Sequence, residues 1–332
     1  FFCKHCNNTF IAETNLIDRN KNISNNTELQ LNLELMQKQS EKDIAKRLDI
    51  SVSKIDRKLN EISSHKVLRH ETLPTSMNWD EFKATKDTKG KMAFIITNNE
   101  SGNIFDIKDS RKTYDLEKYF KRYSRKERDK VKHISIDFYS GYISLAEKLF
   151  KNADISIDRF HIIIQVYNAL NNARINLCYK NNPDYKKLKD YWKLIVKNER
   201  DLSDKKKYSK HFKKDISQKE IVQYLINTDK TLEATYECYQ GIINSLNDKY
   251  FNKFKSIITH ENKNISDKMK QALKLFNKNI KYIENSFKYD INNGIIEGTN
   301  NLIKCLKRIA FGYRKYDHFI ARIFLIKGMI KE

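Results

Sequence analysis

Three acidic residues stand where they could bind divalent cations together. Asp80 lies in the segment NWDEF, Asp137 in ISIDFYSGY and Glu297 in NGIIEGTNN. Carboxylates that are brought together repel one another unless cations neutralise them, and Mg²⁺ prefers such oxygen ligands. Two Mg²⁺ ions about 4 Å apart can activate a water or a 3′-hydroxyl group and stabilise the leaving oxygen of a phosphodiester. The acids therefore predict metal-dependent phosphodiester chemistry, provided that the fold brings them together.

Each acid also has a simpler interpretation. An acid at the end of a strand is often solvated or caps the next element, and Glu297 could merely stabilise a helix N-terminus, by up to about 1 kcal/mol. Glu81 competes with Asp80 as the ligand from its strand, because neighbouring residues on a strand point to opposite faces. The joint placement of the three acids favours the catalytic interpretation.

The segments around the acids predict the elements that position them. Alternating, β-branched segments predict five strands, with a hairpin turn at 99–102 between the second and third: 75–82, 91–98, 102–110, 131–138 and 153–160. Helical patterns follow the third and fourth strands, at 114–130 and 140–151, and a long helical region runs from 161 to about 285. This order predicts a ribonuclease-H-like core with an all-helical insertion before its last helix. In such a core the first and fourth strands are neighbours, so the acids would converge.

Residues 28–62 predict a helix-turn-helix that binds DNA. Ser40 would cap a helix at Glu41–Leu48, and Ser51 would cap a second helix at Val52–Leu59 after a two-residue turn. Six apolar residues would form a small core: Ile44, Ala45, Leu48, Ile50, Ile55 and Leu59. The second helix would present five side chains to a DNA groove: Ser51, Ser53, Lys54, Arg57 and Lys58. An ordinary helical hairpin is the alternative.

Cys3 and Cys6 are spaced like half of a zinc knuckle. A complete site needs a second pair, and none follows at the spacing of a zinc ribbon, so residues 1–15 predict a zinc-ribbon remnant. Because the sequence starts at Phe1 and not at Met, we expect a preceding segment that supplies the second pair and completes the Zn²⁺ site. Two incidental thiols are the alternative. The other three cysteines lie singly in helical patterns, which predicts a reducing compartment and no disulfide framework.

The composition predicts a polyanionic partner. The sequence holds 64 Lys and Arg residues against 42 Asp and Glu residues, so the net charge is +22 and the pI about 9.5. This surplus indicates nucleic acid, with a membrane surface as the competing partner. No apolar run approaches the roughly 18 residues of a spanning helix and there is no signal peptide, so we expect a cytoplasmic protein without a membrane partner.

Basic residues gather in a few runs of the sequence. These runs cover residues 121–130, 186–189, 205–214 and 304–315. Lys304, Lys307 and Arg308 fall on one face of the last helix and could reach phosphates beside the metals, where each contact steepens the salt dependence of binding. A solvated surface is the alternative for the runs inside the insertion.

Four segments of the sequence carry a family resemblance. MNWDEF, ISIDFYSGY, ISIDRFHII and NGIIEGTNNLIKCLKRIAFGYRKYDHF resemble signature segments of DDE transposases of bacterial insertion sequences, specifically the ISL-three family. The resemblance implies Asp80, Asp137 and Glu297 as the catalytic triad and Mg²⁺ (or Mn²⁺) as the cofactor. Similar transposases carry a Cys/Asp-x-x-His motif after the fifth strand, which Asp158 and His161 match. This match implies positioning of DNA or of the active site, and a structural hydrogen bond at the strand end is the alternative.

The resemblance covers nearly the whole chain and departs from the family at the single cysteine pair. With the patterns above, it predicts five regions of a multidomain α+β and α protein: a partial zinc ribbon (1–15), the helix-turn-helix (28–62), the ribonuclease-H-like core (76–161), the helical insertion (162–288) and the last core helix with the catalytic Glu (289–332).

The predicted function is that of a DNA transposase. It would cleave strands and transfer them to target DNA at the terminal inverted repeats of an insertion sequence, as a homo-oligomer on double-stranded DNA in the bacterial nucleoid. A non-catalytic DNA-binding repressor derived from a transposase is the alternative. A nuclease of similar fold would explain the acids but not the helix-turn-helix.

Overall fold

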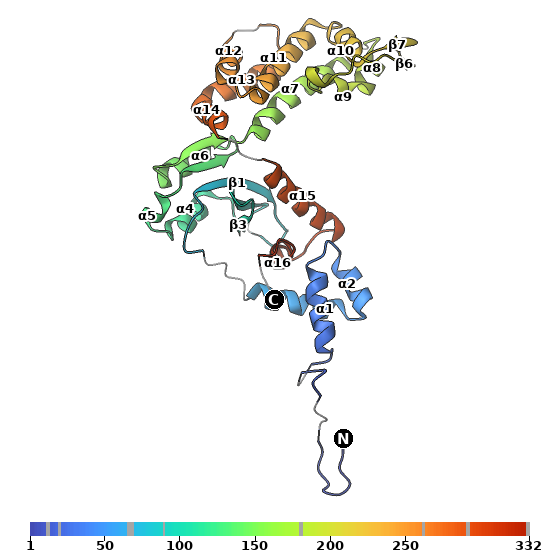
Figure 1. Cartoon of the computed structure of the whole chain (residues 1–332), viewed down its shortest axis with the longest axis vertical. Helices are drawn as coiled ribbons and strands as arrows, with labels where there is room; N and C mark the ends of the chain where they lie inside the picture. Colours follow the sequence, from blue (N-terminus) through green and yellow to red (C-terminus); the bar gives the residue numbers. More distant parts are fainter. Residues whose placement is uncertain are drawn as a thin grey trace. The chain divides into compact units, whose positions relative to one another are not determined.

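The computed structural model describes most of the chain (Figure 1). The described residues are 1–10, 14–18, 21–64, 70–88, 90–178, 182–260, 263–289 and 293–329, without the side chains of 293–297. They fall into two compact units. One comprises Phe1–Thr72, Asp80–Tyr119 and Gly294–Glu332, and the other comprises Leu73–Trp79 and Phe120–Asn293. No helix in the described ranges is both long and apolar enough to cross a bilayer.

A mixed five-stranded sheet has the strand order β3-β2-β1-β4-β5. The strands are β1 (Ser76–Lys83), β2 (Met92–Asn98), β3 (Ile104–Lys108), β4 (His133–Ile136) and β5 (Asp154–Ile157). Strands β1, β4 and β5 pair in parallel, whereas β2 and β3 are antiparallel. All five predicted strands are present, and the first and fourth are neighbours as expected. Strand β4 is shorter than predicted and ends one residue before Asp137.

The hairpin of β2 and β3 packs against the two last helices of the chain. Gly102 in its turn has a φ of 71°, a conformation that glycine adopts without the steric cost of a side chain. Helices α15 (Asn293–Ile309) and α16 (Tyr316–Ile326) supply apolar residues to the same core. Its buried members include Ile95, Ile107, Ile303, Leu306, Phe319 and Ile323. This burial holds α15 in a defined orientation.

Three helices form the N-terminal bundle: α1 (Asn25–Leu35), α2 (Glu41–Leu48) and α3 (Val52–Ser64). Helix α2 has the predicted bounds, and the Ser40 side chain caps it by accepting from the Asp43 backbone N–H. Helix α3 is five residues longer than predicted. All six predicted core residues pack together, joined by Leu31 and Leu35 of α1. The sequence patterns did not predict α1, because its leucines recur at every second residue and not at helical spacing.

The predicted helix at 114–130 is two helices, α4 (Thr113–Lys121) and α5 (Arg125–Arg128). Ser124 interrupts it, because its side chain accepts from the Glu127 backbone N–H and starts a new helix. Helix α6 (Ser140–Leu149) then connects β4 to β5, as predicted.

The insertion is built mainly of helical elements, and Figure 1 labels the α-helices among them. They are α7 (Arg159–Cys178), α8 (Tyr185–Asp190), α9 (Trp192–Ile195), a 3₁₀ helix (Glu199–Asp201), α10 (Gln218–Ile226), α11 (Lys230–Asn247), α12 (Phe251–Thr259), α13 (Asp267–Lys278) and α14 (Ile280–Lys288). Helix α7 packs against α11 and α13, and α14 packs against β5.

The prediction of an all-helical insertion is wrong at one place. Strands β6 (Lys207–Ser209) and β7 (Lys214–Ile216) form an antiparallel hairpin within the basic run 205–214. Lys213 turns the chain there with a φ of 53°. Strands of three residues are too short to show a period of two against so many lysines.

Candidate active site

Asp80 lies on β1 and is held by two hydrogen bonds. One carboxylate oxygen, Oδ1, accepts from the Glu81 backbone N–H at 2.7 Å. The other, Oδ2, accepts from Asn300 Nδ2 at 2.6 Å. Asn300 belongs to α15, so this bond joins the first strand of the sheet to the last part of the chain. The sequence patterns had singled out no role for Asn300.

Glu81, the competing acid of this strand, is already neutralised. Its two carboxylate oxygens each lie 2.8 Å from Arg111 Nη1. No such cation pairs with Asp80 in the described ranges. Of the two neighbours, Asp80 is therefore the acid without a cation partner among the described residues.

Asp137 follows β4 directly and is partly buried. Its Oδ1 accepts from the Tyr139 backbone N–H at 2.8 Å, which fixes the turn into α6. The parallel register of β1 and β4 pairs Asn78 with Ser135. Asp80 lies two residues after the first member of this pair, and Asp137 two residues after the second.

Glu297 lies in the first half of α15, three residues before Asn300. Its side chain is outside the described residues. Of the His, Cys, Asp and Glu side chains that the structure describes, no three form a group that could hold a metal ion. The convergence of all three acids thus stays a prediction, whereas the contact between α15 and Asp80 is observed.

Comparison with known proteins identifies the family. The model of the DDE transposases of the ISL-three (ISL3) type, described as "Transposase", matches residues 78–323, about three quarters of the chain. The chain belongs to this family. The resemblance inferred from the sequence is thereby confirmed, and the matched range contains Asp80, Asp137 and Glu297. DDE transposases use divalent metal ions, which agrees with the acidic character of these residues.

A curated protein of Lactococcus lactis subsp. lactis also matches a part of the chain. It is named "ATP-dependent protease" and is 29% identical over 130 residues. The match covers 38% of this chain and 42% of that protein, so the chain spans less than half of that relative's length. The name describes that protein, and the family of this chain is given by the longer match.

Helix α15 of this ISL-three family member carries the three predicted phosphate-binding residues, of which two are exposed. Lys304 and Arg308 are exposed. Lys307 is half-buried: its Nζ donates to the Lys83 carbonyl oxygen and lies 5.1 Å from the centre of the Phe319 ring. Burial lowers the pKa of Lys307, and the charge of Lys83 adds to this effect. Lys307 therefore ties α15 to the end of β1, and its contact with phosphate stays a prediction.

The predicted DNA-reading helix is α3. Ser51, Ser53 and Arg57 are exposed and Lys54 is partly so, as a reading face requires. Ser51 also caps the helix, because its Oγ accepts from the Lys54 backbone N–H at 3.2 Å.

Lys58 does not belong to that reading face, contrary to the prediction. It is 9% exposed, and its Nζ lies 3.9 Å from Glu28 and 3.7 Å from Glu61. Glu28 belongs to α1, the helix that the patterns missed. Because its side chain is buried beside these two carboxylates, Lys58 is internal and does not face a groove.

Asp158 and His161, the remaining family motif, stand at the start of α7. Asp158 is 8% exposed, and its Oδ1 accepts from the Phe160 backbone N–H at 2.9 Å, as a helix cap does. The His161 ring is partly buried and meets the Phe160 ring edge-on at 5.6 Å. Arg159 between them donates to the Ser286 carbonyl oxygen at 2.9 and 2.7 Å. The motif thus connects α7 to α14, the first and last helices of the insertion.

Cys3 and Cys6 lie in a short hairpin closed by the bridge between Phe2 and Thr9. Cys3 is partly buried and Cys6 is exposed. The backbone N–H groups of Cys6 and His5 lower the pKa of the Cys3 thiol, which favours the thiolate that binds zinc. The pair can supply two of the four ligands of a structural zinc site.

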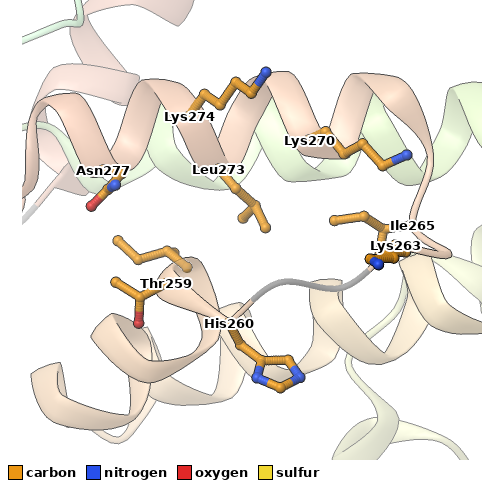
Figure 2. Close-up of a pocket in the computed structure, with 9 residues that line it drawn as sticks. Thr259, His260, Lys263, Ile265, Lys270, Leu273, Lys274 and Asn277 are labelled. Carbon is orange, nitrogen blue, oxygen red and sulfur yellow. The ribbon is translucent and has the colours of Figure 1, made fainter.

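The insertion also contains a basic pocket of about 560 Å³ between α12 and α13 (Figure 2). Its lining combines basic with buried apolar residues: Ile258, Thr259, His260, Lys263, Ile265, Lys270, Leu273, Lys274 and Asn277. Figure 2 shows Leu273 pointing from α13 toward the segment that carries Thr259.

Proposed function

We propose that this chain is a DNA transposase that cleaves and joins DNA at the ends of an insertion sequence. Its membership of the ISL-three family is the observation that carries the proposal. We assign the ribonuclease-H-like core to 76–161 and 289–332, the insertion to 162–288, the helix-turn-helix to 28–62 and a zinc-ribbon remnant to 1–15.

The register of the sheet supports one site for Asp80 and Asp137. Both acids follow the paired residues Asn78 and Ser135 by two positions. Residues two apart on a strand face the same side, and neighbouring strands are about 4.8 Å apart. Asp137 directly follows β4, so we infer that its carboxylate lies on the side of the sheet that Asp80 faces.

The helix α15 supports the third acid. Asn300 contacts Asp80, and Glu297 precedes Asn300 by three residues in the same helix. Residues three apart on a helix are neighbours on one face. The contact at Asn300 therefore supports a position for Glu297 beside Asp80.

The acids have the chemistry of a divalent-metal site. An ionised carboxylate offers about four acceptor positions, and Asp80 uses two of them in the described contacts. Asp80, Asp137 and Glu297 would hold Mg²⁺ or Mn²⁺, which prefer carboxylate oxygens. When bound, such ions act as Lewis acids toward the nucleophile and neutralise charge on the leaving oxygen.

The reaction we propose has two steps at phosphorus. In the first, a water oxygen forms a bond to a phosphodiester phosphorus at the end of the element, the P–O3′ bond breaks, and the 3′ oxygen takes up a proton. In the second, the freed 3′-hydroxyl attacks a phosphodiester of target DNA, whose own 3′ oxygen leaves. Lys304 and Arg308, exposed on the helix of Glu297, would hold the phosphates on either side of the reacting bond.

Three surfaces of the chain would contact double-stranded DNA. The reading face of α3, with Ser51, Ser53, Lys54 and Arg57, would recognise the terminal inverted repeats. The exposed side of α15 would hold the scissile strand. The lysines that line the pocket of the insertion would bind phosphates of flanking or target DNA. Because two ends must be joined to one target, we propose that the chain works as a homo-oligomer.

Two smaller motifs have supporting roles in this proposal. Asp158 would position the insertion relative to the fifth strand by capping α7. His161, in the first turn of α7, would contribute to the same positioning. Cys3 and Cys6 would bind Zn²⁺ with a second ligand pair.

A cleavage assay tests the proposed function. The substrate is a labelled duplex carrying the terminal inverted repeat, incubated with Mg²⁺ or with EDTA. We expect nicking at the element boundary with Mg²⁺ alone, lost in Asp80→Asn and in Glu297→Gln. Glu81→Gln is the matched control and should still cleave, because Arg111 already neutralises this acid. Tight binding without cleavage by the unmodified chain would contradict catalysis and favour a repressor.

A further inference from the structure

Asn300 makes the contact that joins α15 to the strand of Asp80. The two residues are 220 positions apart, and Asn300 Nδ2 lies 2.6 Å from Asp80 Oδ2. The other carboxylate oxygen accepts from the Glu81 backbone N–H at 2.7 Å. Each oxygen of Asp80 therefore has one donor from the chain, and the two donors together fix the plane of the carboxylate.

These donors orient Asp80 without neutralising it. The amide of Asn300 is uncharged, and within the described ranges no Lys or Arg pairs with Asp80. Glu81 shows the contrast, because Arg111 binds both of its oxygens at 2.8 Å. A carboxylate that is oriented by neutral groups keeps its full negative charge for a cation.

The second polar atom of Asn300 is buried and has no partner in the described structure. This atom, Oδ1, is among the buried oxygens that make no hydrogen bond. An unsatisfied buried acceptor is unfavourable, and in native proteins such atoms are almost always satisfied by protein groups, water or an ion. The side-chain oxygen next to Asp80 therefore points to a donor or cation that binds there.

The packing of α15 explains why Asn300 and not its neighbour makes this contact. Thr299, Ile303 and Leu306 are buried and set the rotation of the helix. Asn300 is then partly buried at the strand, and Asn301 is exposed. Asn300 at the strand and Asn301 in solvent are thus adjacent residues of the same type in different environments, and Asn301 can serve as a control.

We propose that Asn300 is a positioning residue for metal binding by Asp80. Its Nδ2 holds the carboxylate in the orientation that binds the ion, and its Oδ1 accepts a hydrogen bond from water that accompanies the ion. This inference rests on the proposed function, in which Asp80 is a metal ligand. Partners that orient a metal ligand typically contribute 10- to 100-fold to metal affinity, so we expect about 10-fold or more from Asn300.

The test measures Mn²⁺ binding to the full chain without DNA, from the loss of the electron paramagnetic resonance signal of free Mn²⁺. The variants are Asn300→Ala and Asn300→Leu, the second of which keeps the side-chain volume and guards against loss through a cavity. Asn301→Ala is the matched control, and Asp80→Asn is the reference for loss of the ligand. Circular dichroism and thermal unfolding of each variant report the stability separately.

We expect both Asn300 variants to weaken Mn²⁺ binding by about 10-fold or more, with Asn301→Ala within twofold of the unmodified chain. Unchanged affinity in the Asn300 variants, together with loss in Asp80→Asn, would overturn this inference and leave the proposed function standing. Unchanged affinity in Asp80→Asn would overturn the assignment of the ligand itself. An equal loss in Asn301→Ala would also contradict the inference, because it would show a general effect on α15.

Discussion

The buried histidine of β4 predicts that the chain loses stability in mild acid. His133 lies in the sheet, where Nδ1 is 3.1 Å from Ser76 Oγ and Nε2 is 2.8 Å from Ser156 Oγ. Its ring stacks on Tyr289 at 4.2 Å. The two hydroxyl groups satisfy the neutral ring, and none of the carboxylates that the structure describes bonds to it directly. Burial lowers the pKa of His133 to about 4, and the charge of Asp154 opposes this only in part.

The direction and the size of this stability loss follow from the pKa of His133 in the folded and in the unfolded chain. The unfolded chain takes up a proton on this histidine near the ordinary pKa of about 6.5, whereas the folded chain does so only near pH 4. The contribution of His133 to the free energy of unfolding is therefore fully present above pH 6.5, and it is lost as the pH drops from 6.5 to 4. The full loss is about 3 kcal/mol, of which about 2 kcal/mol is reached at pH 5. The strand concerned leads into Asp137, so cleavage assays belong above pH 6.5.

Urea unfolding followed by circular dichroism at pH 7.5 and pH 5 measures this loss. His133→Gln is the reference, because glutamine can serve both serine hydroxyls and does not titrate. We expect the unmodified chain to lose about 2 kcal/mol more than the variant between the two pH values. Equal losses in the two proteins would refute the reasoning, since other titrating groups would then explain the whole effect.

Three further predictions concern DNA contacts and a helix cap. Lys304→Gln should lower the slope of log affinity for duplex DNA against log salt concentration by about 0.9. Lys307→Gln should lower the stability of the chain and leave this slope unchanged. Filter binding measures the slope, and thermal melting measures the stability. Replacing Lys270 and Lys274 together by Gln should lower the slope by about 1.8 on long duplexes and leave nicking of a short repeat intact. Ser40→Ala removes the cap of α2 and should lower the free energy of unfolding by about 1 kcal/mol, measured by thermal melting. It should also weaken recognition of the repeat.

Much of the sheet could be predicted from local patterns. The strand before Asp137 alternates between isoleucine and polar residues, and the order of the strands with the helices between them specified which strands are neighbours. Prediction of α2 and its cap succeeded for the same reason, since Ser40 and the apolar residues after it lie within one short segment.

Contacts between distant segments could not be predicted in this way. The bond from Asn300 to Asp80 and the bond from Arg159 to Ser286 join residues more than one hundred positions apart. No local spacing encodes such pairs, because they depend on how helices pack against the sheet. Lys58 illustrates the reverse case: its charge indicated a surface position, but its side chain is buried near Glu28 and Glu61.

Short and irregular elements were the other source of error. The leucines of α1 alternate in sequence, and two of them, Leu29 and Leu33, remain exposed on the helix. The hairpin of β6 and β7 has strands of only three residues inside a basic run. In both places the hydrophobic pattern does not match the periodicity of the element that forms, so tertiary packing determines the structure.

The most direct test of the central claim replaces single acids by cysteine. The claim is that Asp80, Asp137 and Glu297 bind the metal ions of one phosphodiester-cleaving site. Mn²⁺ is a softer ion than Mg²⁺ and accepts a thiolate ligand more readily. Nicking of the repeat duplex by Asp80→Cys and Asp137→Cys is therefore measured with each ion in turn. We predict loss of nicking with Mg²⁺ and partial recovery with Mn²⁺ in both variants. Full activity with Mg²⁺, or a loss that Mn²⁺ leaves unchanged in both, would contradict the claim.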